Sequence, residues 1–212
     1  MTTPEHTLVG VHTALATGLH RRFGWQVVVL AAVASNLPDW DGLPMLIDMA
    51  RFESGHRVWG HNLLAITLSS VLVATLQWRF HLIDRLAHKL RRWKPADFSL
   101  AETSDMVRGP APWSVLLVVC LVAQLLHLPC DMVVSGGKGL SDWQVQPFWP
   151  WSDTGYALPL VPWGDVGPTV ILMLGVIAVA KLPRRATMVS AATLVVLIAY
   201  LLLRGWSRGV VG

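Results

Sequence analysis

The chain has 212 residues, of which 53% are hydrophobic and only 14% are charged, and its formal net charge is +4. A soluble domain carries nearer a quarter of charged residues, so this composition excludes an ordinary water-soluble domain and indicates a membrane protein. The positive charge does not call for a nucleic-acid partner, because membrane topology explains it better.

Apolar segments recur along the whole chain. Each is near the length needed to cross about 30 Å of hydrocarbon, although the shortest are marginal. They predict an all-α, polytopic membrane protein with about five to six transmembrane helices, in one integral-membrane domain that covers residues 1–212. In chain order the segments are 7–19, which His12 interrupts and which is the weakest, 23–37, 63–78, 113–128, 168–182 and 186–203.

Two polar segments connect the predicted spans. Segment 79–112 is basic, and its stretch HLIDRLAHKLRRW predicts an amphipathic helix on the anionic cytoplasmic leaflet. Segment 130–167 is rich in tryptophan and proline and is expected on the outer side. Six spans with the N-terminus outside would place 12 Lys and Arg inside and 5 outside. This bias predicts a multi-pass protein of the cytoplasmic (inner) membrane.

Under this topology, side chains with metal-binding chemistry all fall near the outer ends of spans. Ionisable groups at membrane depth are costly unless they are paired, hydrated or bound to a cation. Carboxylates beside imidazoles suit Zn²⁺, Mn²⁺ or Fe²⁺ better than Ca²⁺. Four separate regions of the chain supply the expected metal ligands, which are His6, Asp39, Asp41, His56, His61, His127 and Asp131.

The spacings of these residues suit ligation. Asp39 and Asp41 would point the same way if the backbone after Pro38 is extended. His127 and Asp131, at positions i and i+4, would share one face of a helix. Each motif alone also has a simpler interpretation as a turn, a polar loop or a helix cap. Their combination at one depth favours a metal site.

His56 and His61 are five residues apart, too far round a straight helix for both to ligate one ion. We therefore expect His56 on the turn that enters the third span and His61 on the first turn of that span. Gly60 would permit a close backbone approach.

The chain resembles the YdjM-type family of predicted membrane-bound, metal-dependent hydrolases. The resemblance runs from residue 6 to about residue 150, and Gly60 and Asn62 depart from the usual Thr and Ser. The His/Asp pattern is more loosely similar to zinc-dependent phospholipase C. The motifs that carry the resemblance are His6-Thr-Leu-Val-Gly10, Pro38-Asp-Trp-Asp41, His56-Arg-Val-Trp-Gly-His-Asn62, His127-Leu-Pro-Cys-Asp131, Gly136-Gly-Lys-Gly139 and Gln146-Pro-Phe148.

The resemblance implies a hydrolase with two or three divalent ions, zinc first and manganese or iron as alternatives. A metal-activated water would attack a phosphoester, with Asp39 and Asp41 in the metal site. Arg57 would hold a phosphate or, alternatively, form a salt bridge with Glu53 or Asp48. A site at the membrane surface favours membrane lipids and a lipid or lipid-linked substrate. The alternatives are a divalent-metal transporter and a metal-binding scaffold or partner-binding protein. The sequence does not predict the oligomeric state.

Overall fold

The computed structural model of the chain describes residues 1–91, 110–136 and 143–210. These residues form helices and two isolated β-bridges, with no strand among them, which confirms the predicted all-α class. The elements in chain order are α1 (Thr3–Ala16), α2 (Leu19–Phe23), α3 (Gln26–Ala34), the 3₁₀ helix η1 (Leu37–Leu46), α4 (Met49–Gly55), α5 (Leu63–Phe80), α6 (Leu82–Arg91), α7 (Trp113–Val133), α8 (Gly167–Lys181), the 3₁₀ helix η3 (Pro183–Arg185) and α9 (Ala186–Ser207).

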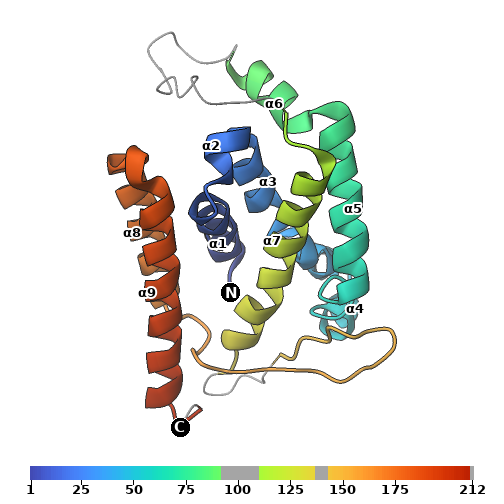
Figure 1. Cartoon of the computed structure of the whole chain (residues 1–212). Coiled ribbons are helices and arrows are strands. Elements are labelled where there is room, and N and C mark those ends of the chain that lie inside the picture. The colour runs from blue at the N-terminus through green and yellow to red at the C-terminus, as the bar shows by residue number, and fades with distance from the viewer. Residues whose placement is uncertain (92–109, 137–142, 211–212) are drawn as a thin grey trace.

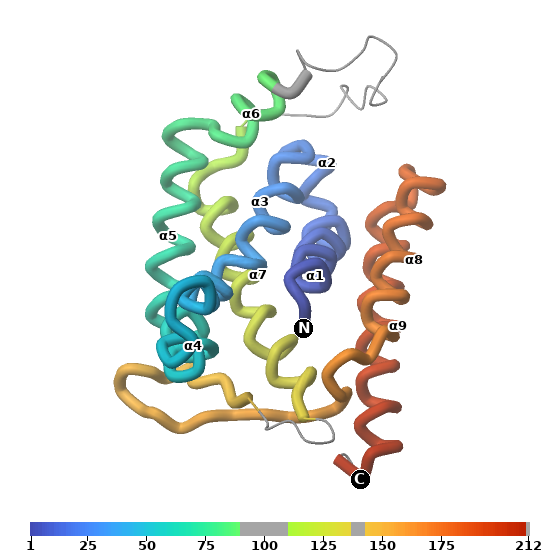
Figure 2. The backbone as a smooth tube through the Cα atoms, turned by 180° about the vertical axis from the view of Figure 1, so that it is seen from behind, coloured from blue at the N-terminus to red at the C-terminus, as the bar shows by residue number. Residues whose placement is uncertain are grey.

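The short N-terminal helices lie between two pairs of long ones (Figures 1 and 2). α5 packs against α7 on one side, and α8 packs against α9 on the other. α1 contacts α3 and α7 as well as α8 and α9, so it joins the two pairs. Apolar side chains such as Leu30 on α3 and Val119 on α7 fill the space between these helices. Polar groups on the inner face of α1 are consequently shielded on both sides.

Three helical segments of the described chain are long and apolar enough to cross a membrane. They are α5, α7 and the continuous Pro183–Ser207 segment that contains η3 and α9. The prediction of about five to six spans was therefore too high. α8 is apolar but has only 15 residues, which at 1.5 Å per residue rise about 22 Å.

The predicted segments 7–19 and 23–37 form helices that are too short to span a membrane. α1 has 14 residues and α3 only nine, and nine residues rise about 14 Å, less than half the thickness of the hydrocarbon. Gly18 and Gly24 adopt positive φ angles of 71° and 78° and separate α2 from its neighbours. After Ala34 the chain tightens into η1, so the second apolar segment stops short.

The two ends of the molecule differ in character (Figure 1). α2, α6 and η3 lie at one end, and η1, α4 and the segment 143–166 lie towards the other. The predicted amphipathic helix of segment 79–112 is confirmed as α6, whereas residues 92–109 of that segment lie outside the described residues. Residues 137–142 of the predicted outer segment also lie outside them. The acidic and imidazole side chains of the candidate site lie towards the η1 end.

Candidate metal centre

Three parts of the chain deliver four side chains to one buried point. Asp39 comes from η1, and His61 comes from the turn between α4 and α5. His127 and Asp131 come from the last turns of α7, one helical turn apart as their spacing predicted. One donor atom from each lies within 4.8 Å of the others, and only Asp39 among them is not buried.

The same four atoms recur in every short contact of this cluster. His61 Nε2 lies 3.0 Å from His127 Nε2 and 3.1 Å from Asp131 Oδ2. Asp39 Oδ1 lies 3.3 Å from His127 Nε2 and 3.6 Å from His61 Nε2, and His127 Nε2 lies 3.5 Å from Asp131 Oδ2. A tetrahedral zinc site with bonds of 2.0–2.1 Å has ligand atoms about 3.3 Å apart. The donor set therefore fits one tetrahedral divalent ion.

The Nδ1 atoms of His61 and His127, which lie on the ring side away from the four-donor cluster, each have a partner. His127 Nδ1 lies 2.7 Å from the Ser35 carbonyl oxygen, and His61 Nδ1 lies 2.9 Å from Asp41 Oδ2. A carbonyl oxygen only accepts, so the Nδ1–H of His127 donates and its Nε2 carries a lone pair when the ring is neutral. Carboxylate and carbonyl partners of this kind orient metal-bound histidines. Two nitrogens and two carboxylates that face one another at these distances could hold a cation between them.

Asp39 and Asp41 point to different places, because the extended backbone on which their expected common direction depended is not present. The backbone after Pro38 is a 3₁₀ helix and is not extended. With three residues per turn, positions i and i+2 lie about 120° apart around the axis. Asp39 therefore faces the four-donor cluster, whereas Asp41 is fully buried against the Nδ1 atoms of His56 and His61, at 3.0 and 2.9 Å.

His6 and His56 belong to the same network at its edges. His6 Nε2 lies 2.9 Å from Asp131 Oδ1, and its ring stacks on His127 with centroids 3.7 Å apart. The Met1 amino nitrogen contacts the same Asp131 oxygen at 2.6 Å. All seven predicted ligands thus meet in one network, in which four converge on a common point and the other three support them. Nothing in the side-chain pattern signalled the Ser35 contact, because Ser35 contributes a backbone carbonyl.

Both residues that depart from the family pattern have structural roles here. The Gly60 amide donates to Asp41 Oδ2 at 2.8 Å, and a Cβ atom on Gly60 would collide with the Pro38 carbonyl oxygen. The predicted close approach at Gly60 is thus confirmed. Asn62 caps α5 by accepting from the Ala65 amide, so His61 precedes the helix. The expectation that His61 lies on the first turn of the span was wrong.

Contacts between the imidazoles and the carboxylates favour the charged forms of both kinds of group. Burial alone would lower the pKa of His61, but its contacts with Asp131, Asp39 and Asp41 outweigh burial and raise the pKa to about 10. Burial would raise the pKa of Asp41, whereas hydrogen bonds from His56 and His61 hold it below its usual value. Asp39 is likewise held ionised by its histidine contacts. Without a metal ion, a proton on His61 would supply the positive charge.

Arg57 is buried beside the cluster. Its Nε lies 3.4 Å from Asp131 Oδ2, and its Nη1 donates to the carbonyl oxygens of Asp131 and Trp143. Its guanidinium also lies over the rings of Trp143 and Trp163. The alternative of a salt bridge with Glu53 or Asp48 was wrong, because Arg57 pairs with Asp131 and Asp48 pairs with Arg51. Arg57 adopts φ 64°, a strained conformation for a non-glycine residue.

These features define an integral-membrane helical protein with a buried Asp/His centre suited to a divalent cation. The family model described as YdjM inner membrane protein matches residues 1–211, so the chain belongs to that family, as the resemblance predicted. The family places it among inner membrane proteins. No curated protein and no solved structure matches the chain.

Proposed function

We propose that this protein is a membrane-embedded, metal-dependent hydrolase that cleaves a phosphoester of a lipid or lipid-linked substrate. The observation that carries the proposal is the set of four donor atoms with tetrahedral spacing, provided by Asp39, His61, His127 and Asp131. A divalent ion held there, zinc first and manganese or iron as alternatives, would have to accept a water molecule as a fifth ligand in order to activate it and to polarise the scissile group. The predicted second or third ion would have to use the surrounding carboxylates and histidines.

The residues around the donor set would keep it in position. Asp41 fixes the ring of His61, and the Ser35 carbonyl fixes that of His127. Arg57 neutralises part of the charge on Asp131 and holds its carboxylate from the other side. In this proposal the buried Arg57 also provides positive potential towards an anionic substrate, whereas direct contact between Arg57 and a phosphate stays a prediction. Asp39, with 26% of its side chain exposed, marks the side from which a substrate would approach.

The surroundings of the site favour an amphiphilic substrate. The Trp/Pro-rich segment is attached to the site through the Gln146 amide, which donates to the Arg57 carbonyl at 3.2 Å. Trp151 is 75% exposed on this segment, and Trp40 is 49% exposed on η1 beside Asp39. Indole rings at a protein surface next to a membrane prefer the headgroup region. With the basic end of the molecule inside, the site would face the outer side of the membrane.

A metal transporter is the main alternative. Beyond the donor set, the interior between α1, α3 and α7 is filled by apolar side chains, including Val27, Leu30 and Leu116. An ion path across the membrane would need polar groups or broken helices through that region. Counterflow of zinc across reconstituted vesicles would identify transport, and its absence together with bound metal would favour a resident ion.

The test uses the full chain purified in detergent and loaded in metal-replete buffer. Its metal content and its cleavage of phosphatidylglycerol, phosphatidylcholine and phosphatidic acid vesicles would be measured beside Asp39→Asn. Asp153→Asn is the matched control, because Asp153 is exposed and its carboxylate has no recorded partner in the described chain. We expect the wild type and the control to bind metal and to cleave lipid, and Asp39→Asn to lose both. A folded, metal-loaded wild type that releases no product from any of these lipids would refute the cleavage of phospholipids, and Asp39→Asn with full metal content would refute the metal centre itself.

A further inference from the structure

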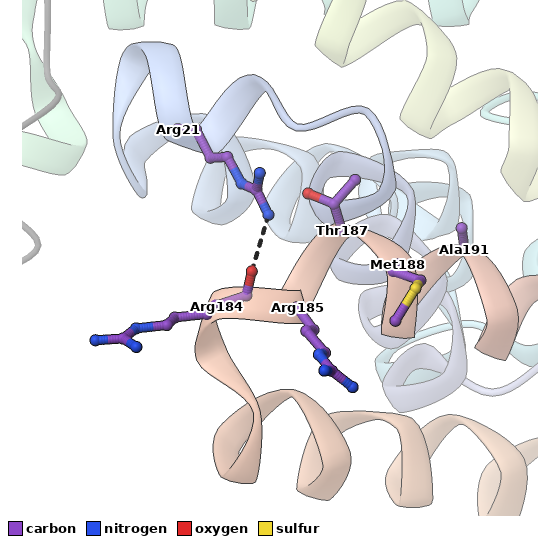
Figure 3. Close-up of a pocket in the computed structure, with 6 residues that line it drawn as sticks. All are labelled: Arg21, Arg184, Arg185, Thr187, Met188 and Ala191. Atoms are coloured by element: carbon purple, nitrogen blue, oxygen red, sulfur yellow. Dashed lines mark hydrogen bonds between the residues drawn. The ribbon is translucent and has the colours of Figure 1, made fainter.

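A basic pocket opens at the end of the molecule opposite the metal centre, between α2 and the start of α9 (Figure 3). It is a surface pocket of about 670 Å³. Figure 3 shows that two segments of the chain, more than 160 residues apart in sequence, contribute to it. The basic pocket is lined by Arg21, Arg184, Arg185, Thr187, Met188 and Ala191.

Three arginines line this pocket without a counter-charge in the described part of the chain, and Figure 3 shows the Arg21 guanidinium directed at the Arg184 backbone while the Arg184 side chain extends outward. Arg21 donates from Nη2 to the Arg184 carbonyl oxygen at 3.1 Å, which ties α2 to η3 but uses only one of its five N–H donors. Among the described residues, no carboxylate forms an ion pair with Arg21, Arg184 or Arg185. Their charges are not compensated by the described residues, so a bound anion towards which these long side chains can turn would be stabilised.

Two further features of the pocket favour an anion. The Thr187 hydroxyl is buried and has no hydrogen-bond partner among the described residues. A buried, unpaired hydroxyl is unusual and is explained if a ligand oxygen accepts from it. The pocket also lies at the N-terminus of the 22-residue helix α9, where no side chain caps the helix. The helix dipole there adds to the positive potential.

We propose that the basic pocket binds a phosphate group. Guanidinium groups match the geometry of phosphate oxygens and bind them through paired, charge-assisted hydrogen bonds. The wall formed by Met188 and Ala191 continues onto the apolar surface of α9, where the acyl chains of a phospholipid would run. Either a phospholipid headgroup or free phosphate provides the required chemistry, and the apolar wall favours the headgroup. This site is independent of the metal centre and of the proposed hydrolysis.

The test compares lipid binding by the full-length protein and two triple variants, measured by native mass spectrometry from detergent. The probes are dioleoylphosphatidylglycerol, dioleoylphosphatidylcholine and inorganic phosphate as a competitor. In the pocket variant, Arg21, Arg184 and Arg185 are changed to Gln. Each hydrogen bond to a charged group is worth about tenfold in affinity, so we expect phosphatidylglycerol to bind at least about tenfold more weakly.

The control variant changes Arg22, Arg79 and Lys181 to Gln, which removes the same charge from exposed positions on α2, α5 and α8 that do not line the basic pocket and do not lie on the amphipathic helix α6. We expect it to bind phosphatidylglycerol within about twofold of the wild type. Equal losses in both triple variants would show diffuse attraction to anionic lipid and overturn the proposal. Absence of binding by the wild type to both phospholipids and to phosphate would overturn it as well.

Two single substitutions test the basic pocket in case the triple variant fails to fold. Arg184→Gln keeps the backbone carbonyl that Arg21 contacts, and Thr187→Val removes only the unpaired hydroxyl. Both should fold and weaken binding several-fold, and unchanged binding in both would refute the site. Competition by inorganic phosphate would identify the phosphate group alone as the ligand. Lipid binding that excess phosphate leaves unchanged would identify the phospholipid headgroup.

Discussion

Two groups of buried histidines in this protein have opposite surroundings. His12, on the inner face of α1, lies 3.1 Å from the Ser190 hydroxyl through Nδ1 and 3.1 Å from the Leu172 carbonyl oxygen through Nε2. Those neutral partners satisfy a neutral imidazole completely, with one nitrogen donating and the other accepting. His61 and His127 instead face each other and two carboxylates.

The comparison distinguishes the buried histidines that could hold a metal ion from one that could not. Burial alone does not distinguish them, because His12, His61 and His127 are all almost fully inaccessible. The difference is that the nitrogens of His12 are used up by its neighbours, whereas each cluster histidine has one nitrogen oriented by a partner and one directed at other donors. Changes in the four-donor cluster are therefore expected to alter metal affinity, whereas a change at His12 is not. Four predictions test this difference, from the largest expected effect on metal affinity to the smallest.

Removing a central donor should have the largest effect. His61→Ala deletes the side chain that contacts the other three donors, so the variant should retain almost no zinc after dialysis. Elemental analysis of the purified protein measures this directly, with His88→Ala on the exposed face of α6 as the control. Full zinc content in a folded His61→Ala protein would contradict the four-donor site.

Asp41→Asn should weaken zinc binding without abolishing it. The Asp41 carboxylate contacts Nδ1 of His61 and accepts a hydrogen bond from the Gly60 amide. Asp41 therefore orients the His61 ring without being one of the four donors. Loss of such a partner typically costs about 10- to 100-fold in metal affinity. Competition with a chromophoric chelator gives the affinity. A complete loss like that of His61→Ala would show that Asp41 itself ligates the ion, as the sequence had predicted.

Zinc affinity should rise with pH. The pKa of His61 is raised to about 10 in the metal-free protein, so at neutral pH the ring carries a proton that zinc must displace. Displacement of one proton makes the affinity increase by about tenfold per pH unit below that pKa. Titrations between pH 6 and pH 8 would measure the slope. An affinity that stays level or falls over this range would show that His61 does not bind zinc through the protonated nitrogen.

His12→Ala should leave zinc affinity within about twofold of the wild type while it destabilises the fold. The change leaves the Ser190 hydroxyl and the Leu172 carbonyl unpaired and opens a cavity between α1, α8 and α9. A loss of about 2–4 kcal/mol in the free energy of unfolding is expected. Thermal unfolding in detergent reports the stability. Loss of zinc from a folded His12→Ala protein would mean that the two groups of histidines are coupled.

Much of the site could be predicted from the sequence because its ligands occur in short, recognisable spacings. The i, i+4 pair of His127 and Asp131 follows from helical geometry alone, and α7 continues through Pro129 to present both. The chemistry of the residue types, acids and imidazoles at the ends of apolar segments, indicated that they would meet.

The sequence could not predict which of those residues form the four-donor cluster and which support it from outside. This assignment depends on whether the chain after Pro38 is extended or 3₁₀-helical, and proline with neighbouring polar residues permits both. The number of spans was overestimated for a related reason. Hydropathy detects apolar stretches, but α1 ends before the turn at Gly18, and α3 ends at Ala34 where the chain tightens towards η1, so both helices are too short to cross the bilayer.

X-ray absorption at the zinc edge, measured on purified full-length protein, tests the metal centre most directly. The donor set predicts two histidine nitrogens and two carboxylate oxygens, at about 2.0–2.1 Å from one zinc ion. Sulfur at about 2.3 Å would instead mean that Cys120 or Cys130 ligates the metal, in contradiction to the centre described here.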